Sequence, residues 1–91
     1  MSEVRHLVIT GLVQGVGYRY SMAAAARAHG ITGWVRNRRN GSVEAMVAGN
    51  AEAVAAIIDW ARRGPAGADV AHVNVELGQG EFAGFEQRDT A

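Results

Sequence analysis

The chain has 91 residues, of which 48% are hydrophobic, and its nine acidic residues balance nine basic ones. This length fits one domain, residues 1–91, with a single core, and the hydrophobic share excludes a disordered chain. Because cysteine and lysine are both absent, disulfides, thiolate metal sites and Schiff-base catalysis are excluded, and the balanced charge does not favour nonspecific binding to nucleic acid.

The first third of the chain is predicted to run from a strand into a helix. Residues 4–13 are rich in β-branched and aliphatic side chains, which favours a strand that ends at a glycine-containing segment. Residues 18–29 include five alanines, which favour a helix. Gly30 is typical of the residue that ends a helix, and Ile31 can fold back onto the last turn.

A hairpin and a second helix follow. Residues 32–37 and 42–48 are predicted strands, and Asn40-Gly41 between them is a strong hairpin signal. Asn50 is a predicted N-cap, and the spacing of Val54, Ile57, Ile58 and Ala61 predicts an amphipathic helix that Gly64-Pro65 ends. Residues 71–77 alternate as a further strand, and residues 82–88 can form a short last one.

The resulting order is β, α, β, β, α, β, with a possible short fifth strand. This order predicts an α+β fold, the ferredoxin-like α/β sandwich, in which an antiparallel sheet carries both helices on one face. The fold hosts many activities, so function has to come from a site.

The segment Gln14-Gly15-Val16-Gly17-Tyr18-Arg19 is the strongest candidate for a site. Glycines between a strand and a helix let successive N–H groups turn toward an anion, and an arginine adds a planar fork of donors. A tight turn alone also explains two glycines. The segment is neither a Walker A loop nor GxGxxG, so a nucleotide site is not indicated.

A second segment, Gly33-Trp34-Val35-Arg36-Asn37, precedes the Asn40-Gly41 turn and Ser42-Val43-Glu44. Together with Gly11, the glycine loop and Gly30, it closely resembles the acylphosphatase family. The resemblance extends through Gly49, Gly64-Pro65, Ala68, Val70 and Val73 to Phe85-Glu86, and so covers nearly the whole chain.

The resemblance implies a metal-independent hydrolase of acyl phosphates with no cofactor. The family's catalytic arginine falls on Arg19 and its catalytic asparagine on Asn37. Its phosphate loop corresponds to Gly15, Val16, Gly17 and Tyr18, opened by Gln14, with Arg19 also binding phosphate. Two positions depart from the family pattern: Arg38 replaces a hydroxyl residue found in some members, and Asn40 stands where bacterial-looking versions often have aspartate.

The chemistry agrees with this sparse set of residues. A carboxylate, whose acid has a pKa of about 4, leaves without a general acid, so positioning and electrostatic stabilisation suffice. An asparagine amide can orient a water but is not a useful base, so we expect the proton to pass to a phosphate oxygen of the substrate. His6, His29 and His72 are scattered and are interpreted as ordinary histidines, with no metal site.

Several alternatives stay open at this point. Arg36, Arg38 and Arg39 are favoured as a solvated hairpin tip over a cluster that attracts anionic substrates. Trp34 and Trp60 are expected to be packing residues. The protein is expected to be a cytoplasmic monomer without nucleic-acid or membrane partners, acting on a small-molecule acyl phosphate. The rival function is a non-catalytic anion-binding or regulatory module of the same fold.

Overall fold

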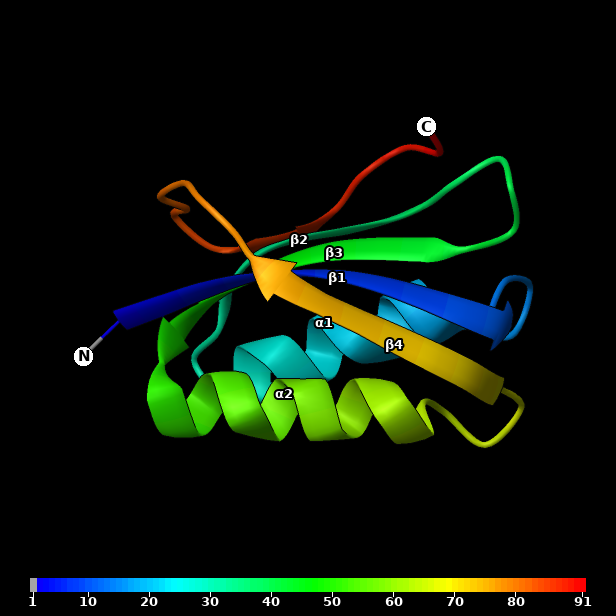
Figure 1. Ribbon diagram of the computed structural model, residues 1–91, viewed down its shortest axis with the longest axis horizontal. Coiled ribbons are helices and arrows are strands. Elements are labelled where there is room, and N and C mark those ends of the chain that lie inside the picture. The colour runs from blue at the N-terminus through cyan, green and yellow to red at the C-terminus, as the bar shows by residue number, and fades with distance from the viewer. Residues whose placement is uncertain (1) are drawn as a thin grey trace.

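The computed structural model describes residues 2–91. Its elements are β1 (Ser2–Leu12), α1 (Tyr18–Ala28), β2 (Thr32–Asn37), β3 (Val43–Asn50), α2 (Ala51–Arg63), β4 (Asp69–Leu77) and β5 (Phe85–Gln87). All seven predicted elements are present, with ends that differ from the predicted ones by three residues at most. The five strands form one sheet in the order β4-β1-β3-β2-β5, and both helices lie on the same side of it (Figure 1).

The core lies between the sheet and the helices. Leu7 and Ile9 of β1 pair with Ala45 and Val43 of β3, and all four side chains are fully buried. Since side chains alternate along a strand, the intervening residues of β1 and β3 face the open side of the sheet. The alternation along β3, with Val43, Ala45 and Val47 on one side and Glu44 and Met46 on the other, therefore separates the core from a second, mixed face.

The ends of the helices follow the predicted signals. The side chain of Asn50 accepts a hydrogen bond from the N–H of Ala53 at 2.8 Å, which caps the N-terminus of α2. The N–H of Ile31 returns to the carbonyl of Ala26 at 2.8 Å after Gly30, which closes α1 as expected. No helix within residues 2–91 is long and apolar enough to cross a membrane.

The four long strands form the predicted antiparallel sheet, and the pairing of β5 with β2 makes the whole sheet mixed. Strand β5 forms, but it runs parallel to β2, with Gly33 opposite Phe85 and Val35 opposite Gln87. The chain reaches this edge by crossing from β4 at the opposite edge, so its direction follows from the crossover. A strand of three residues carries too little pattern to show this.

The predicted hairpin between β2 and β3 forms, and its connection is one residue longer than the four residues predicted. A two-residue hairpin turn with Asn-Gly would require positive φ at both residues. Here five residues, 38–42, join the strands, and only Gly41 has a positive φ, of 93°. The side chain of Asn40 instead accepts hydrogen bonds from the N–H of Ser42 at 3.0 Å and from its hydroxyl at 2.6 Å.

Both tryptophans pack, as predicted. The ring of Trp60 on α2 lies 5.3 Å from that of Tyr18 on α1. Trp34 is only 7% exposed, although its neighbour Val35 points into the core. The guanidinium groups of Arg36 and Arg88 lie 4.8 and 4.9 Å from the centre of its ring and cover it on the open face of the sheet.

Candidate active site

A pocket of about 150 Å³ lies where the loop between β1 and α1 meets the end of β2. It is lined by Val13, Gly15, Gly17, Tyr18, Arg19, Tyr20, Asn37 and Gln87. It therefore brings together Arg19 and Asn37, the two predicted catalytic residues. A larger hollow of about 320 Å³ beside β5 contains neither of them, and two carboxylates in its lining, from Glu81 and Glu86, disfavour an anion there.

The glycine loop has the backbone conformation that the sequence predicts. Gly15 and Gly17 have φ values of 75° and 77°, and a Cβ built on either would meet no atom within 4 Å. Glycine is therefore required there by the backbone conformation and not by lack of space. Helix α1 begins directly after Gly17, without a side-chain cap and without an acidic residue in its first turn. Its first N–H groups can thus serve an anion.

Tyr18 fixes the start of this helix. Its side chain is 1% exposed, and its hydroxyl donates a 2.7 Å hydrogen bond to the carbonyl of Ala61 on α2. Burial raises the pKa of the Tyr18 phenol far above its ordinary value. Because the side chain is committed to the core, only the main chain of Tyr18 can meet a ligand in the pocket.

The cation and the amide of the predicted site have few competing contacts. The guanidinium of Arg19 makes one long hydrogen bond, of 3.4 Å, to the carbonyl of Arg88, and no carboxylate of residues 2–91 lies within salt-bridge distance of it. Asn37 ends β2 two residues after the buried Val35, so its side chain lies on the same face as the helices. Within the described chain that amide makes no hydrogen bond, so both groups are available to a ligand.

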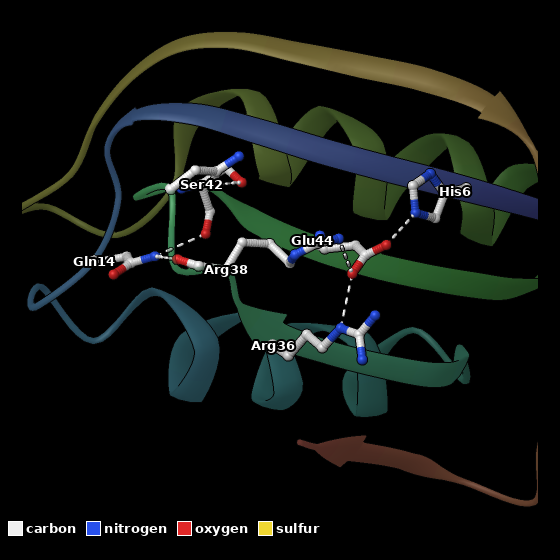
Figure 2. Close-up of polar contacts among 7 residues, drawn as sticks. His6, Gln14, Arg36, Arg38, Ser42 and Glu44 are labelled. Atoms are coloured by element: carbon white, nitrogen blue, oxygen red, sulfur yellow. Dashed lines mark hydrogen bonds and ion pairs between the residues drawn. The ribbon is translucent and has the colours of Figure 1, made fainter. Parts of the chain in front are cut away.

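Two residues of the predicted loop do not line the pocket. Val16 is half-buried and packs against the core. The side chain of Gln14 points to the β2–β3 turn, where it donates hydrogen bonds to the carbonyls of Arg38 and Ser42 at 2.7 and 2.8 Å (Figure 2). Phosphate binding by the backbone of either residue stays a prediction.

Three lining residues were not predicted. Val13 directly follows β1, and Tyr20, which is 73% exposed, directly follows Arg19. Gln87 comes from β5, which lies beside β2 only because of the parallel pairing. The adjacency of Val13 and Tyr20 to the loop could have indicated them, whereas no sequence signal places Gln87.

Two of the three arginines of the hairpin are held by one carboxylate. Glu44 Oε1 accepts hydrogen bonds from Arg36 Nε at 2.7 Å and from an Nη of Arg38 at 3.1 Å, while its Oε2 lies 2.6 Å from Nε2 of His6 (Figure 2). Burial by itself would raise the pKa of Glu44, but the hydrogen bonds from His6, Arg36 and Arg38 outweigh it and lower this pKa to about 2. A solvated hairpin tip thus describes the exposed Arg39, but not Arg36 or Arg38.

The histidines stay apart, as predicted. His6 contacts Glu44 on the open face of the sheet, and His29 and His72 are exposed elsewhere. Residues 2–91 contain no group of three or more histidine, cysteine or acidic side chains that could hold a metal ion. None of the residues around the pocket is a histidine or an acid.

Sequence comparison points to one family. The acylphosphatase family model matches residues 5–87. The acylphosphatase of Albidiferax ferrireducens is 53% identical over 91 residues, which cover 99% of each chain. That of an Acidovorax species is 57% identical over 90 residues, which cover 98% of this chain and 93% of the relative.

Structural comparison gives the same answer. An acylphosphatase from Coxiella burnetii superposes with a TM-score of 0.92 at 32% identity, covering 96% of this chain and 93% of the other. The acylphosphatase from Bacillus subtilis superposes with a TM-score of 0.90 at 27% identity, covering 97% and 99%. Because the family model matches residues 5–87, which is nearly the whole chain, the chain belongs to the acylphosphatase family.

Proposed function

We propose that Arg19 and the backbone of residues 15–18 hold the phosphoryl group of an acyl phosphate, and that Asn37 orients the water that attacks it. The chain is an acylphosphatase, like the relatives that share 53% and 57% of its residues. The observation that carries the residue roles is the pocket itself, where the little-engaged guanidinium of Arg19 and the free amide of Asn37 line the same space as the glycine loop.

The proposed roles of Arg19 and Asn37 follow from the charge that each side chain carries or lacks. A phosphoryl group in transfer carries negative charge on its oxygens, which the Arg19 fork and N–H groups at the start of α1 stabilise without reorganisation. The amide of Asn37 offers both a donor and an acceptor, so it can hold a water in line with the P–O bond that breaks. Water adds its oxygen to phosphorus, the P–O bond to the acyl group breaks, and the carboxylate leaves with the bonding pair.

The proton of the water needs an acceptor. Since no histidine or carboxylate lines the pocket, we assign the proton to a phosphoryl oxygen of the substrate. The leaving carboxylate needs no proton at neutral pH, because the pKa of its acid is about 4. The pocket therefore suits an anhydride and not a phosphomonoester, whose alkoxide leaving group would require an acid or a metal.

The first test of the proposal is the substitution Arg19→Ala. In chelator, the wild-type chain should hydrolyse acetyl or benzoyl phosphate, and Arg19→Ala should lose at least about a hundredfold in kcat/KM, because it loses the charge in the ground state and the transition state. Competitive inhibition by inorganic phosphate should weaken in the same variant. Steady-state kinetics measure both.

Arg62→Ala is the matched control, since Arg62 is an exposed arginine on α2 outside this pocket. It should behave as wild type. An Arg19→Ala variant that keeps its kcat/KM would contradict the proposed role, and tight phosphate binding without turnover by the wild type would favour the non-catalytic module.

Other predictions from the sequence belong to this proposal. We propose that residues 1–91 act as a single domain and as a monomer, in the cytoplasm, on a small-molecule acyl phosphate and without a nucleic-acid partner. The even charge balance supports the absence of a polyanionic partner. Size-exclusion chromatography with light scattering would test the monomer.

A further inference from the structure

The side chain of Gln14 joins the glycine loop to the turn between β2 and β3, and the proposed mechanism requires these two segments to keep a fixed relative position. Its amide nitrogen donates to the carbonyl oxygens of Arg38 at 2.7 Å and of Ser42 at 2.8 Å. Since both neighbours are carbonyl oxygens, the group between them must be the NH₂, and both of its hydrogens are used. Figure 2 shows Gln14 reaching from the loop before α1 to the turn between β2 and β3.

The two segments carry the two halves of the candidate site. Gln14 is followed directly by Gly15, where the loop that lines the pocket begins. Arg38 directly follows Asn37, which lines the pocket from β2. In the chain the Gln14 bonds span 24 and 28 residues, so the contact is tertiary and not part of a local turn.

Arg38 is a firm anchor for this contact. Its N–H donates to the carbonyl of Ser42 at 2.8 Å, and its guanidinium donates to the buried Glu44 at 3.1 Å. The turn also has its own internal support, because the side chain of Asn40 accepts hydrogen bonds from the N–H and hydroxyl of Ser42. The turn therefore closes without Gln14, but the Gln14 side chain joins the turn to the glycine loop.

We propose that Gln14 is a positioning residue: its bridge to the carbonyls of Arg38 and Ser42 sets the glycine loop against Asn37, so that the water held by Asn37 meets the bound phosphoryl group in line. The proposal rests on the roles proposed above for Arg19 and Asn37. In that case Gln14 acts on the attack step through Asn37 and does not bind the substrate with its side chain.

The first experiment uses Gln14→Met, which keeps the length of the side chain and removes both donors. A displacement of the reacting groups by a fraction of an ångström to 1 Å costs up to about a hundredfold in rate, so kcat should fall at least about tenfold. Inhibition by inorganic phosphate should change less than about threefold, because the loop and Arg19 remain.

Asn40→Ala is the matched control, since it removes side-chain hydrogen bonds from the same turn without touching the bridge. It should keep kcat within about threefold of the wild type at a comparable loss of thermal stability. If Asn40→Ala and Gln14→Met lose kcat equally, the turn's stability explains both, and the positioning role is wrong.

A double-mutant cycle separates positioning from a general structural effect. If Gln14 acts through Asn37, Gln14→Met in the Asn37→Ala background should lower the residual rate by less than about twofold. The same loss in both backgrounds would overturn the proposal. Failure of the proposed function looks different, because Asn37→Ala alone would then keep its kcat.

A folding defect is recognised separately. Circular dichroism and thermal melting show whether Gln14→Met is folded at the assay temperature; if it is not, the cycle is run with Gln14→Glu, which has a similar size and, when ionised, no donor. Equal loss of phosphate binding and kcat in a folded Gln14 variant would contradict the proposal, since Gln14 would then shape the phosphate loop itself.

Discussion

Gly17 lies immediately before α1 and has a φ of 77°, and a Cβ built on it would meet no atom within 4 Å. A side chain there is strained by about 1–2 kcal/mol in the left-handed region, and the strain is relieved only if the loop moves. We predict that Gly17→Ala lowers the free energy of unfolding by this amount, measured by urea denaturation, and raises the inhibition constant of inorganic phosphate.

Gly30→Ala provides the comparison at the same scale. Gly30 has a φ of 69°, also with no atom within 4 Å of a Cβ, but it ends α1 away from the pocket. It should cost similar stability and leave phosphate inhibition unchanged. If both variants weaken phosphate binding equally, the effect of Gly17 is a general loss of stability and not a property of the loop.

At single residues, the sequence predicts backbone conformation and helix caps better than it predicts the partners of a side chain. The glycines of the loop and the cap at Asn50 follow from local chemistry, so they could be predicted. The destination of the Gln14 amide could not, because its acceptors are carbonyls 24 and 28 residues away, and any residue type carries a carbonyl.

Strands β2 and β3 are tied together on the open face of the sheet by Glu44, whose side chain is 9% exposed. The lowered pKa of this carboxyl, about 2 against an ordinary 4.5, means that its charged form is favoured by folding. Its contribution, of the order of 3 kcal/mol at neutral pH, is complete above about pH 4.5 and is lost as the pH falls toward 2.

We predict that Glu44→Gln destabilises the protein at pH 7 and flattens the pH dependence of unfolding between about pH 4.5 and 2. Chemical denaturation at several pH values measures this. Glu86→Gln is the control, because the Glu86 carboxylate is 61% exposed in its pair with Arg88, and exposed pairs contribute little. An unchanged pH dependence in Glu44→Gln would show that Glu44 is not the group responsible.

At the level of elements, local patterns were sufficient for the helices and the four long strands. The alternation along β3 separated the core face from the face of Glu44, but it did not show that Glu44 is buried. Its burial depends on three partner side chains: Arg36 and Arg38 from the neighbouring strand and turn, and His6 from the strand on the other side. The order of the strands in the sheet decides which side chains surround Glu44. A short stretch of sequence does not contain that order.

The pocket is a property of the whole molecule. It needs the loop before α1, the end of β2 and the parallel strand β5, which lie far apart in the chain. The resemblance to acylphosphatases supplied Arg19 and Asn37 in advance, but the parallel pairing that places Gln87 beside them appears only in the folded sheet. The same arrangement keeps Arg19 away from carboxylates while Glu44 engages two other arginines.

The central proposal is that Arg19 and the glycine loop bind the phosphoryl group, whereas Asn37 orients the water. The variant Asn37→Ala tests it, and Asn74→Ala on β4 is the control for loss of an asparagine. The measurement is kcat for benzoyl phosphate in chelator, together with competitive inhibition by inorganic phosphate. We predict that Asn37→Ala loses at least about a hundredfold in kcat while the inhibition constant stays close to that of the wild type. A kcat close to the wild-type value, or a loss of phosphate binding equal to the loss of kcat, would contradict it.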